Sequence, residues 1–184
     1  LNLLISIYIY TKVPEFFLRF LIYILAICMY RVRTKRHENI PSEGAAVIVA
    51  NHVSFVDWMF ILATSPRPIR FMVFAPIYYS KALHWLFKMA KAIPIDSEKA
   101  NPKAFAKAFD EVAAALERGE LVGIFPEGKL TSNGEMDMFR RGIERIIART
   151  PVPVVPVHLD GLWGSMFSRK AKWQLPRLKW SLVS

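Results

Sequence analysis

The stretch AAVIVANHVSFVD (residues 45–57) decides the fold. Its first part, AAVIVA (45–50), is an unbroken apolar run, which predicts a strand buried on both faces of a sheet. The polar pair Asn51-His52 follows, and the chain then enters SFVDWMFILATS (54–65), whose pattern predicts a helix. A buried strand that leads directly into a helix is typical of α/β architecture.

Strands and helices alternate along the rest of the chain. Further strands are predicted at 69–74, 92–95, 121–125 and 153–159, and further helices at 80–91, 102–118 and 138–149. No repeat or linker divides the 184 residues, a length that suits one domain. We therefore predict an α/β domain over residues 31–184, with a mixed, largely parallel sheet flanked by helices.

Residues 1–30 are strongly apolar. Two apolar runs, 1–10 and 16–30, are each shorter than the roughly 20 residues that span a bilayer, and Arg19 interrupts the second. The basic run RVRTKR (31–36) follows. An apolar helix before a basic cluster predicts a membrane-associating helical segment embedded in one leaflet. The alternative is a buried core helix with a solvated basic end.

The charge balance favours polyanionic partners. Lys and Arg number 25 against 15 Asp and Glu, for a net charge of +10. Such a balance favours anionic phospholipid, nucleic acid or phosphate-bearing small molecules as partners. The absence of a zinc spacing, an RNP-like motif and a basic helix with heptads argues against nucleic acid. A single cysteine, Cys28, excludes an intrachain disulfide.

The first candidate site is NHVSFVD (51–57), directly after a buried strand, where ligand sites form in open α/β sheets. The imidazole of His52 can take a proton from a hydroxyl, and the Asp57 carboxylate can fix its tautomer. Residues five apart diverge on a regular helix, so this pairing requires His52 on the loop. The alternative is a capping box, Ser54-x-x-Asp57, with no catalytic role.

The second candidate site is FPEGK (125–129), again after a buried strand. Glu127 and Lys129 beside a glycine turn can bind phosphate, a polar head group or a neighbouring backbone. Arg140 and Arg141 add cations close in sequence. The alternatives are an ordinary Pro-Glu-Gly turn and a solvated basic helix face.

The remaining histidines, His37, His84 and His158, show no metal-ligand spacing. We therefore predict no metal site and no cofactor.

Several blocks together resemble a known family. NHVSFVD (51–57), FPEGKLT (125–131) and PVPVVPV (151–157), in this order, resemble the glycerolipid acyltransferase (PlsC-like) superfamily. FRRG (139–142) is similar to its F-K-x-G element, and KAIPID (91–96) occupies the place of its second block.

The resemblance covers about residues 31–168 and implies roles for individual side chains. It implies that His52 is the general base and that Asp57 orients it. The substrate-binding residues that it implies are Asn51, Ser54, Glu127, Gly128, Lys129, Arg140 and Arg141.

The implied reaction, in phospholipid synthesis or repair, moves a fatty acyl group from acyl-CoA or acyl-carrier protein to the free hydroxyl of a lysophospholipid. The expected place is the cytoplasmic face of the bacterial inner membrane. FPEGKLT, FRRG and GLWGSMFSRK (161–170) most resemble bacterial 2-acylglycerophosphoethanolamine acyltransferase domains. Such domains often lie beside a transporter and an acyl-carrier-protein synthetase in one polypeptide, so a fragment of a longer protein is expected here.

The head group and the reaction class leave alternatives. Many lysophosphatidate acyltransferases carry arginines where this chain has Ser97 and Leu130, which favours lysophosphatidylethanolamine as the acceptor. A lysophosphatidate acyltransferase is the alternative within the family. A catalytically idle membrane-binding domain and a hydrolase that uses the same two residues are the alternatives outside it.

Overall fold

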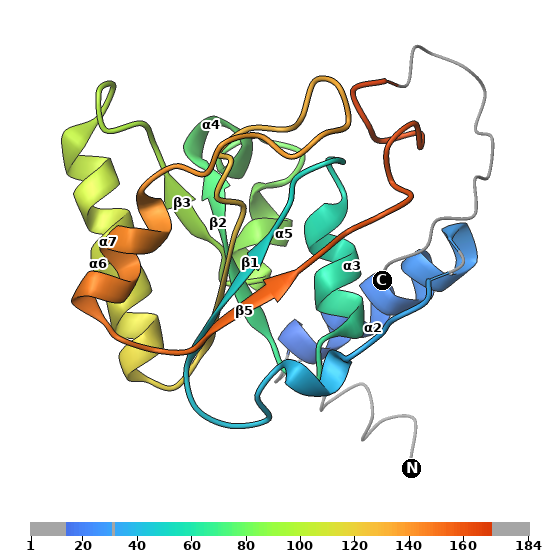
Figure 1. The fold of residues 1–184 in the computed structure, drawn as a ribbon, viewed down its shortest axis with the longest axis horizontal. Coiled ribbons are helices and arrows are strands. Elements are labelled where there is room, and N and C mark those ends of the chain that lie inside the picture. The colour runs from blue at the N-terminus through green and yellow to red at the C-terminus, as the bar shows by residue number, and fades with distance from the viewer. Residues whose placement is uncertain (1–13, 31, 171–184) are drawn as a thin grey trace.

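The computed structural model describes residues 14–30 and 32–170. A five-stranded sheet in the order β3-β2-β4-β1-β5 forms the centre of the molecule (Figure 1). The strands are β1 (Ala46–Ala50), β2 (Ile69–Phe74), β3 (Ile93–Ile95), β4 (Leu121–Ile124) and β5 (Val154–Val157). All four pairings of the described strands are parallel, so the predicted mixed sheet is corrected to a parallel one. A helical crossover connects each described strand to the next, so that the next strand starts at the same edge of the sheet, as parallel pairing requires.

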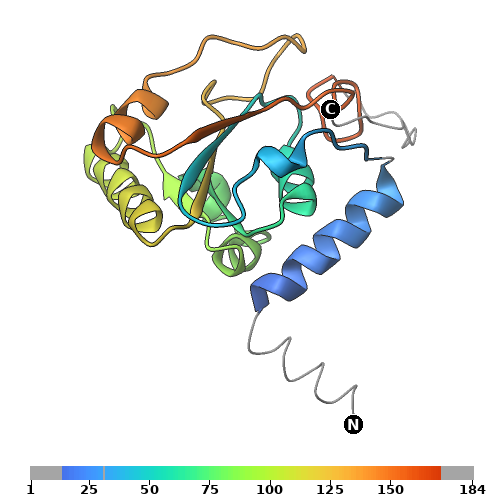
Figure 2. The ribbon, with the colours of Figure 1, turned by 60° about the horizontal axis from the view of Figure 1, so that its bottom comes forward.

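Helices cover both faces of the sheet (Figure 2). They are α2 (Pro14–Met29), the 3₁₀ turn η1 (His37–Asn39), α3 (Asp57–Thr64), α4 (Ala75–Tyr78), α5 (His84–Met89), α6 (Pro102–Glu117) and α7 (Gly142–Arg149). Side chains alternate along β1: Ala46 and Ile48 pack in the core with α2 and α3, whereas Val47 and Val49 pack with α6 and α7. The α/β prediction is confirmed.

Three helices begin later than their sequence pattern predicts: α3, α7 and α5, which begins at His84 although the pattern predicted residue 80. Helix α3 begins at Asp57, because the amides of Val53 and Ser54 donate to the Asp57 side chain and form a turn before the helix. Helix α7 begins at Gly142, because the amide of Arg140 donates to the Pro126 carbonyl at 2.9 Å. Before α3 these side-chain hydrogen bonds compete with the helical ladder, and before α7 a tertiary backbone bond does so.

Helix α2 packs across α3 through one face. Leu18, Ile22 and Ala26 recur every four residues on that face and are buried. Arg19 donates from Nη2 to the carbonyl of Ser65, the C-cap of α3, at 2.5 Å. The cation that interrupts the apolar run therefore satisfies a helix end, where positive charge is favourable.

No helix within 14–30 and 32–170 is long and apolar enough to cross a membrane. The predicted apolar run at 1–10 lies outside the described residues.

Candidate active site

The candidate residues meet at one edge of the sheet. Because the strands are parallel, their carboxyl ends share the edge that is uppermost in Figure 1. His52 follows β1 and Glu127 follows β4, and these two strands are neighbours. This edge is where α/β sheets place their ligand sites.

His52 and Asp57 form a hydrogen-bonded pair. Nδ1 of His52 lies 2.8 Å from Oδ2 of Asp57, a carboxylate with no exposed surface. The same oxygen accepts from the amides of Val53 at 2.7 Å and Ser54 at 2.9 Å. Asp57 therefore both pairs with His52, as the catalytic alternative requires, and accepts from the backbone before α3, as the capping alternative requires. Since an ionised carboxylate only accepts, it holds the proton of His52 on Nδ1.

The Asp57 carboxyl is held in an apolar setting. Burial raises its pKa, and the hydrogen bond from His52 opposes that rise. Its second oxygen, Oδ1, is buried and has no hydrogen-bond partner among the described residues. All three contacts of the carboxylate thus converge on the oxygen that faces His52.

A stack of aromatic rings fixes the His52 imidazole. The ring lies 4.2 Å from the Phe125 ring at 17°, and Phe125 stacks on Phe71 at 5.7 Å. The stack needs Gly123, because a Cβ there would lie 2.5 Å from Phe71 Cε1. The His52 side chain keeps 21% of its surface exposed, and no described residue hydrogen-bonds its Nε2. Nε2 is therefore the atom available to a substrate.

Glu127 holds the backbone around His52. The residue is 1% exposed, and its Oε1 accepts from the His52 amide at 2.8 Å. Its Oε2 accepts from the Asp137 amide at 3.0 Å, and the Thr131 amide donates to the His52 carbonyl at 2.9 Å. The segment after β4 thus hydrogen-bonds both the amide and the carbonyl of His52.

Asn51 and Ser54 tie the same loop to the chain after β5. The Asn51 side chain donates to the Leu159 carbonyl at 2.9 Å and accepts from the Leu159 amide at 2.7 Å. The Ser54 hydroxyl donates to the Phe167 carbonyl at 3.2 Å. Both side chains are buried. Asn51, Ser54 and Glu127 therefore have structural partners, and their contact with substrate stays a prediction.

The predicted cations differ in their availability. Lys129 Nζ pairs with Asp137 Oδ2 at 2.6 Å, and this contact lowers the pKa of the Asp137 carboxyl. Arg140 is exposed and lies against Gly128, where an added Cβ would be 2.8 Å from Arg140 Nε. Gly128 has a φ of +65°, a second reason for glycine. Neither Arg140 nor the exposed N-cap residue Arg141 forms an ion pair in the part of the chain that the structure describes, although the Arg140 charge, after the Lys129 contact, helps to lower the pKa of the Asp137 carboxyl.

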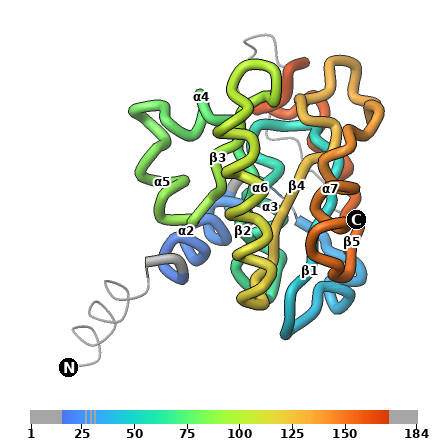
Figure 3. The backbone as a smooth tube through the Cα atoms, turned by 90° about the vertical axis from the view of Figure 1, so that its left-hand side faces the viewer, coloured from blue at the N-terminus to red at the C-terminus, as the bar shows by residue number. Residues whose placement is uncertain are grey.

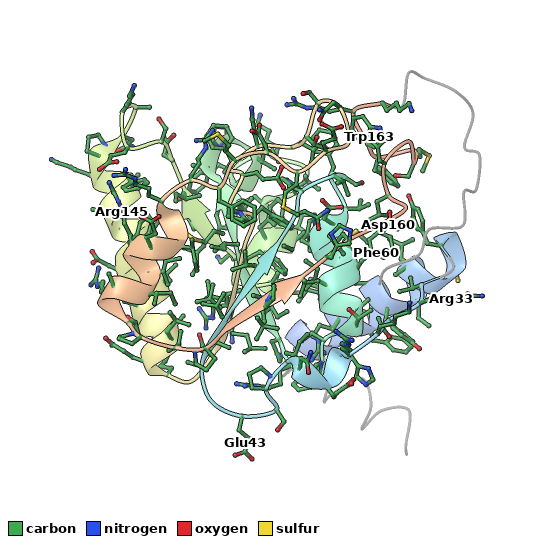
Figure 4. The ribbon with its side chains drawn as sticks, viewed as in Figure 1. Arg33, Glu43, Phe60, Arg145, Asp160 and Trp163 are labelled. Atoms are coloured by element: carbon green, nitrogen blue, oxygen red, sulfur yellow. The ribbon has the colours of Figure 1, made fainter. Side chains whose placement is uncertain are left out.

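A cavity of about 210 Å³ lies beside the His52 loop. It lies between the loop after β4 and the segment after β5, whose residues Asp160 and Trp163 are labelled in Figure 4. Its lining residues are Asn51, Val53, Gly134, Met136, His158, Leu159, Asp160, Gly161 and Trp163. The sequence did not indicate this cavity, because its walls come from three distant segments.

Comparison with known proteins assigns the sequence to a family. The protein family described as Acyltransferase matches residues 31–160. The chain belongs to this family. The predicted superfamily is thereby confirmed, whereas the ethanolamine subtype and the fusion to other domains stay predictions.

Individual relatives support the assignment. The chain is 29% identical over 133 residues to the chloroplastic 1-acyl-sn-glycerol-3-phosphate acyltransferase LPAT1 of Arabidopsis thaliana, covering 72% of this chain and 36% of the relative. It is 29% identical over 131 residues to the 1-acyl-sn-glycerol-3-phosphate acyltransferase of Bacillus subtilis, covering 71% and 63%. The chain thus spans less than two thirds of the length of these curated relatives.

A solved structure shares the fold. The 1-acyl-sn-glycerophosphate acyltransferase PlsC from Thermotoga maritima superposes with a TM-score of 0.64 at 23% identity. The superposition covers 83% of this chain and 57% of that one.

Proposed function

We propose that this chain is an O-acyltransferase that moves a fatty acyl group from an acyl thioester to the free hydroxyl of a lysophospholipid. The observation that carries the proposal is the His52–Asp57 pair, 2.8 Å apart, with Nε2 left open at the carboxyl edge of a parallel sheet. Membership of the acyltransferase family supports the same reaction.

The chemistry needs one base. Nε2 of His52 takes the proton of the lysolipid hydroxyl while the hydroxyl oxygen attacks the thioester carbonyl. The C–S bond then breaks, and the leaving thiolate takes that proton back. Asp57 keeps the proton on Nδ1 and stabilises the imidazolium that forms between these steps. The substrate supplies the nucleophile, so the protein forms no acyl intermediate.

The turn after β4 supplies a donor for the oxyanion. Pro126 has no N–H, and the Gly128 amide already donates to the Phe125 carbonyl at 3.0 Å. The Glu127 amide has no hydrogen-bond partner among the described residues. We assign it to the developing negative charge of the carbonyl oxygen, which backbone amides stabilise in acyl transfer.

The acceptor in this proposal is a lysophospholipid with a capped phosphate, lysophosphatidylethanolamine. A phosphate monoester is best met by an arginine fork. Leu130 is buried and apolar, and the Ser97 hydroxyl accepts from the Ala100 amide at 3.1 Å. Arg140 forms no direct ion pair within the described ranges, and its exposed guanidinium can meet the single charge of a phosphodiester.

Lysophosphatidate is the second candidate acceptor. The observation that favours it is the name of the relatives, which are 1-acyl-sn-glycerol-3-phosphate acyltransferases in Arabidopsis thaliana and Bacillus subtilis.

The site of action in this proposal is the cytoplasmic face of a membrane. The side of α2 turned away from α3 exposes large apolar residues: Phe16, Phe17, Phe20, Leu21, Tyr23, Ile24 and Leu25. The exposed basic residues Arg33, Lys35 and Arg36 follow this helix. Apolar area beside cations suits an anionic bilayer surface.

A donor-by-acceptor screen tests the proposal. Membranes that contain the chain are mixed with acyl-CoA or acyl-carrier protein and with each lysolipid, and both thiol release and diacyl product are measured. We expect thiol and product in equal amounts, with lysophosphatidylethanolamine as the better acceptor. Release of free fatty acid without diacyl product would identify a hydrolase. No turnover with any pair would contradict the proposal.

A further inference from the structure

Large apolar side chains are exposed on a second element, far in sequence from α2. We call this the α4–α5 surface, and it consists of Phe74, Ile77, Tyr79, Leu83 and Trp85. Tyr79 and Trp85 keep 63% and 61% of their surface exposed. Soluble proteins rarely leave such residues together in water, so the cluster indicates an interaction site.

The α4–α5 surface is rigidly built. Tyr78 of α4 stacks on Phe87 of α5 at 6.1 Å, and Phe87 packs against Trp58 of α3 at 5.9 Å. Tyr79 stacks on His84, which bonds through Nδ1 to the Tyr78 carbonyl at 3.2 Å. The inner residues fix the two helices on the α3 core, and the outer ones keep about 40% or more of their surface exposed.

This surface lies on the same side of the molecule as the exposed side of α2. Helix α5 contacts α2. Figures 2 and 3 show α2 and α5 projecting from one side, at the bottom of the first view and at the left of the second, with α4 above α5 in Figure 3. Helix α6 packs on the other face of the sheet. A flat partner surface that covers the exposed side of α2 therefore also contacts α5.

The charge of the α4–α5 surface indicates which kind of partner it binds. Between Phe74 and Ile95 the sequence has three cations and no Asp or Glu. Lys81 and Lys88 are exposed in this region, and no described carboxylate pairs with either of them. Exposed aromatic residues interleaved with unpaired lysines suit the boundary between anionic head groups and acyl chains.

We propose that the α4–α5 surface is a second membrane-contacting element, which docks on an anionic lipid bilayer beside α2. This inference rests on the membrane site given under the proposed function and goes beyond it. Helix α4 begins where β2 ends, and β2 is the neighbour of β4, so the surface adjoins the edge that carries His52 and Glu127. Attachment through α2 alone leaves rotation about the helix axis free. The second contact fixes the orientation and holds the His52 edge at the bilayer surface, where lysolipid enters.

Environment-sensitive labels test the contact directly. Cys28 is exposed, so Cys28→Ser gives a cysteine-free chain in which Leu83→Cys, Leu21→Cys and Lys103→Cys are labelled one at a time with nitrobenzoxadiazole. Vesicles of phosphatidylethanolamine and phosphatidylglycerol are then added. We expect the label at 83, like that at 21, to shift to shorter wavelength and gain intensity, whereas the label at 103 on α6 stays unchanged.

The labels separate the two claims. A response at 21 with a water-exposed label at 83 would overturn the second contact and leave membrane attachment by α2 intact. Water-exposed labels at both 21 and 83 would overturn the membrane site itself. Capture of another protein by the α4–α5 surface, with no change on vesicles, would also overturn the inference.

Activity provides an independent test. Lys81→Glu/Lys88→Glu is expected to lower kcat/KM by about tenfold for long-chain lysolipid presented in anionic vesicles. With a short-chain, soluble lysolipid the same variant should match the wild type. Lys103→Glu/Lys107→Glu makes the same charge change on α6 and serves as the control. Equal activity of the two variants on vesicles would overturn the orienting role.

Discussion

The buried carboxylate of Glu127 offers a sharp test of how the site is held. Its two oxygens accept from the amides of His52 at 2.8 Å and Asp137 at 3.0 Å. Glu127→Gln keeps one carbonyl oxygen and turns an NH₂ group toward the other amide, so one donor loses its partner. An unsatisfied buried donor costs about 1–3 kcal/mol. For a domain of this size the melting temperature falls by roughly 2–12 °C.

Thermal unfolding and steady-state kinetics measure the two consequences of Glu127→Gln. The structure predicts a lower melting temperature and a lower kcat, because the His52 backbone is no longer held. Glu135→Gln is the matched control, since Glu135 lies exposed on the same loop. An unchanged melting temperature together with a raised KM for lysolipid would refute the positioning role. That result would restore the substrate contact predicted from the sequence.

Three further substitutions follow from the contacts. Asp57→Asn should fold yet lose about 10²–10⁴-fold in turnover, because the amide oxygen can still accept from Val53 and Ser54 but carries no charge to stabilise the His52 imidazolium. Burial raises the pKa of Asp57 in the folded protein, so folding favours the protonated carboxyl. The unfolding free energy of the wild type, relative to that of Asp57→Asn, should therefore fall as the pH rises from the usual carboxyl range through the folded pKa. Denaturation at several pH values measures this difference. Asn51→Ala should lose about 1–3 kcal/mol for each bond to Leu159, measured by chemical denaturation. Arg140→Gln should raise KM for lysophospholipid more than Arg141→Gln does, since Arg140 lies on the Gly128 turn.

Short-range pattern predicted the frame of the site well. The run 45–50 gave β1 almost to the residue, because an unbroken apolar stretch of that length suits a strand in a parallel sheet. The pairing of His52 with Asp57 was also accessible, since the two residues are five apart and share one turn.

Partners that lie far apart in sequence could not be predicted in this way. Asn51 bonds to Leu159 across 108 positions, and Ser54 bonds to Phe167 across 113. Periodicity carries no information about such contacts. The family resemblance therefore presented Asn51 and Ser54 as candidates for substrate binding, although the fold buries both.

The contacts of the predicted cations also depend on the fold and could not be predicted from the sequence. Lys129 was predicted as a head-group cation from its place after a glycine turn, and the fold pairs it with Asp137, eight residues later. Arg140 was predicted as a cation close in sequence to that turn, and it is exposed and forms no direct ion pair among the described residues. Only the path of the loop between them distinguishes the two cations.

Replacement of His52 tests whether its imidazole is the general base of acyl transfer. Purified His52→Ala, shown to be folded by its melting temperature, is assayed for thiol release and diacyl product beside wild type. His37→Ala, at an exposed position on η1, is the control. We expect a loss of about 10²–10⁴-fold in turnover for His52→Ala and none for the control. Turnover of folded His52→Ala near the wild-type rate would contradict the general-base role of His52.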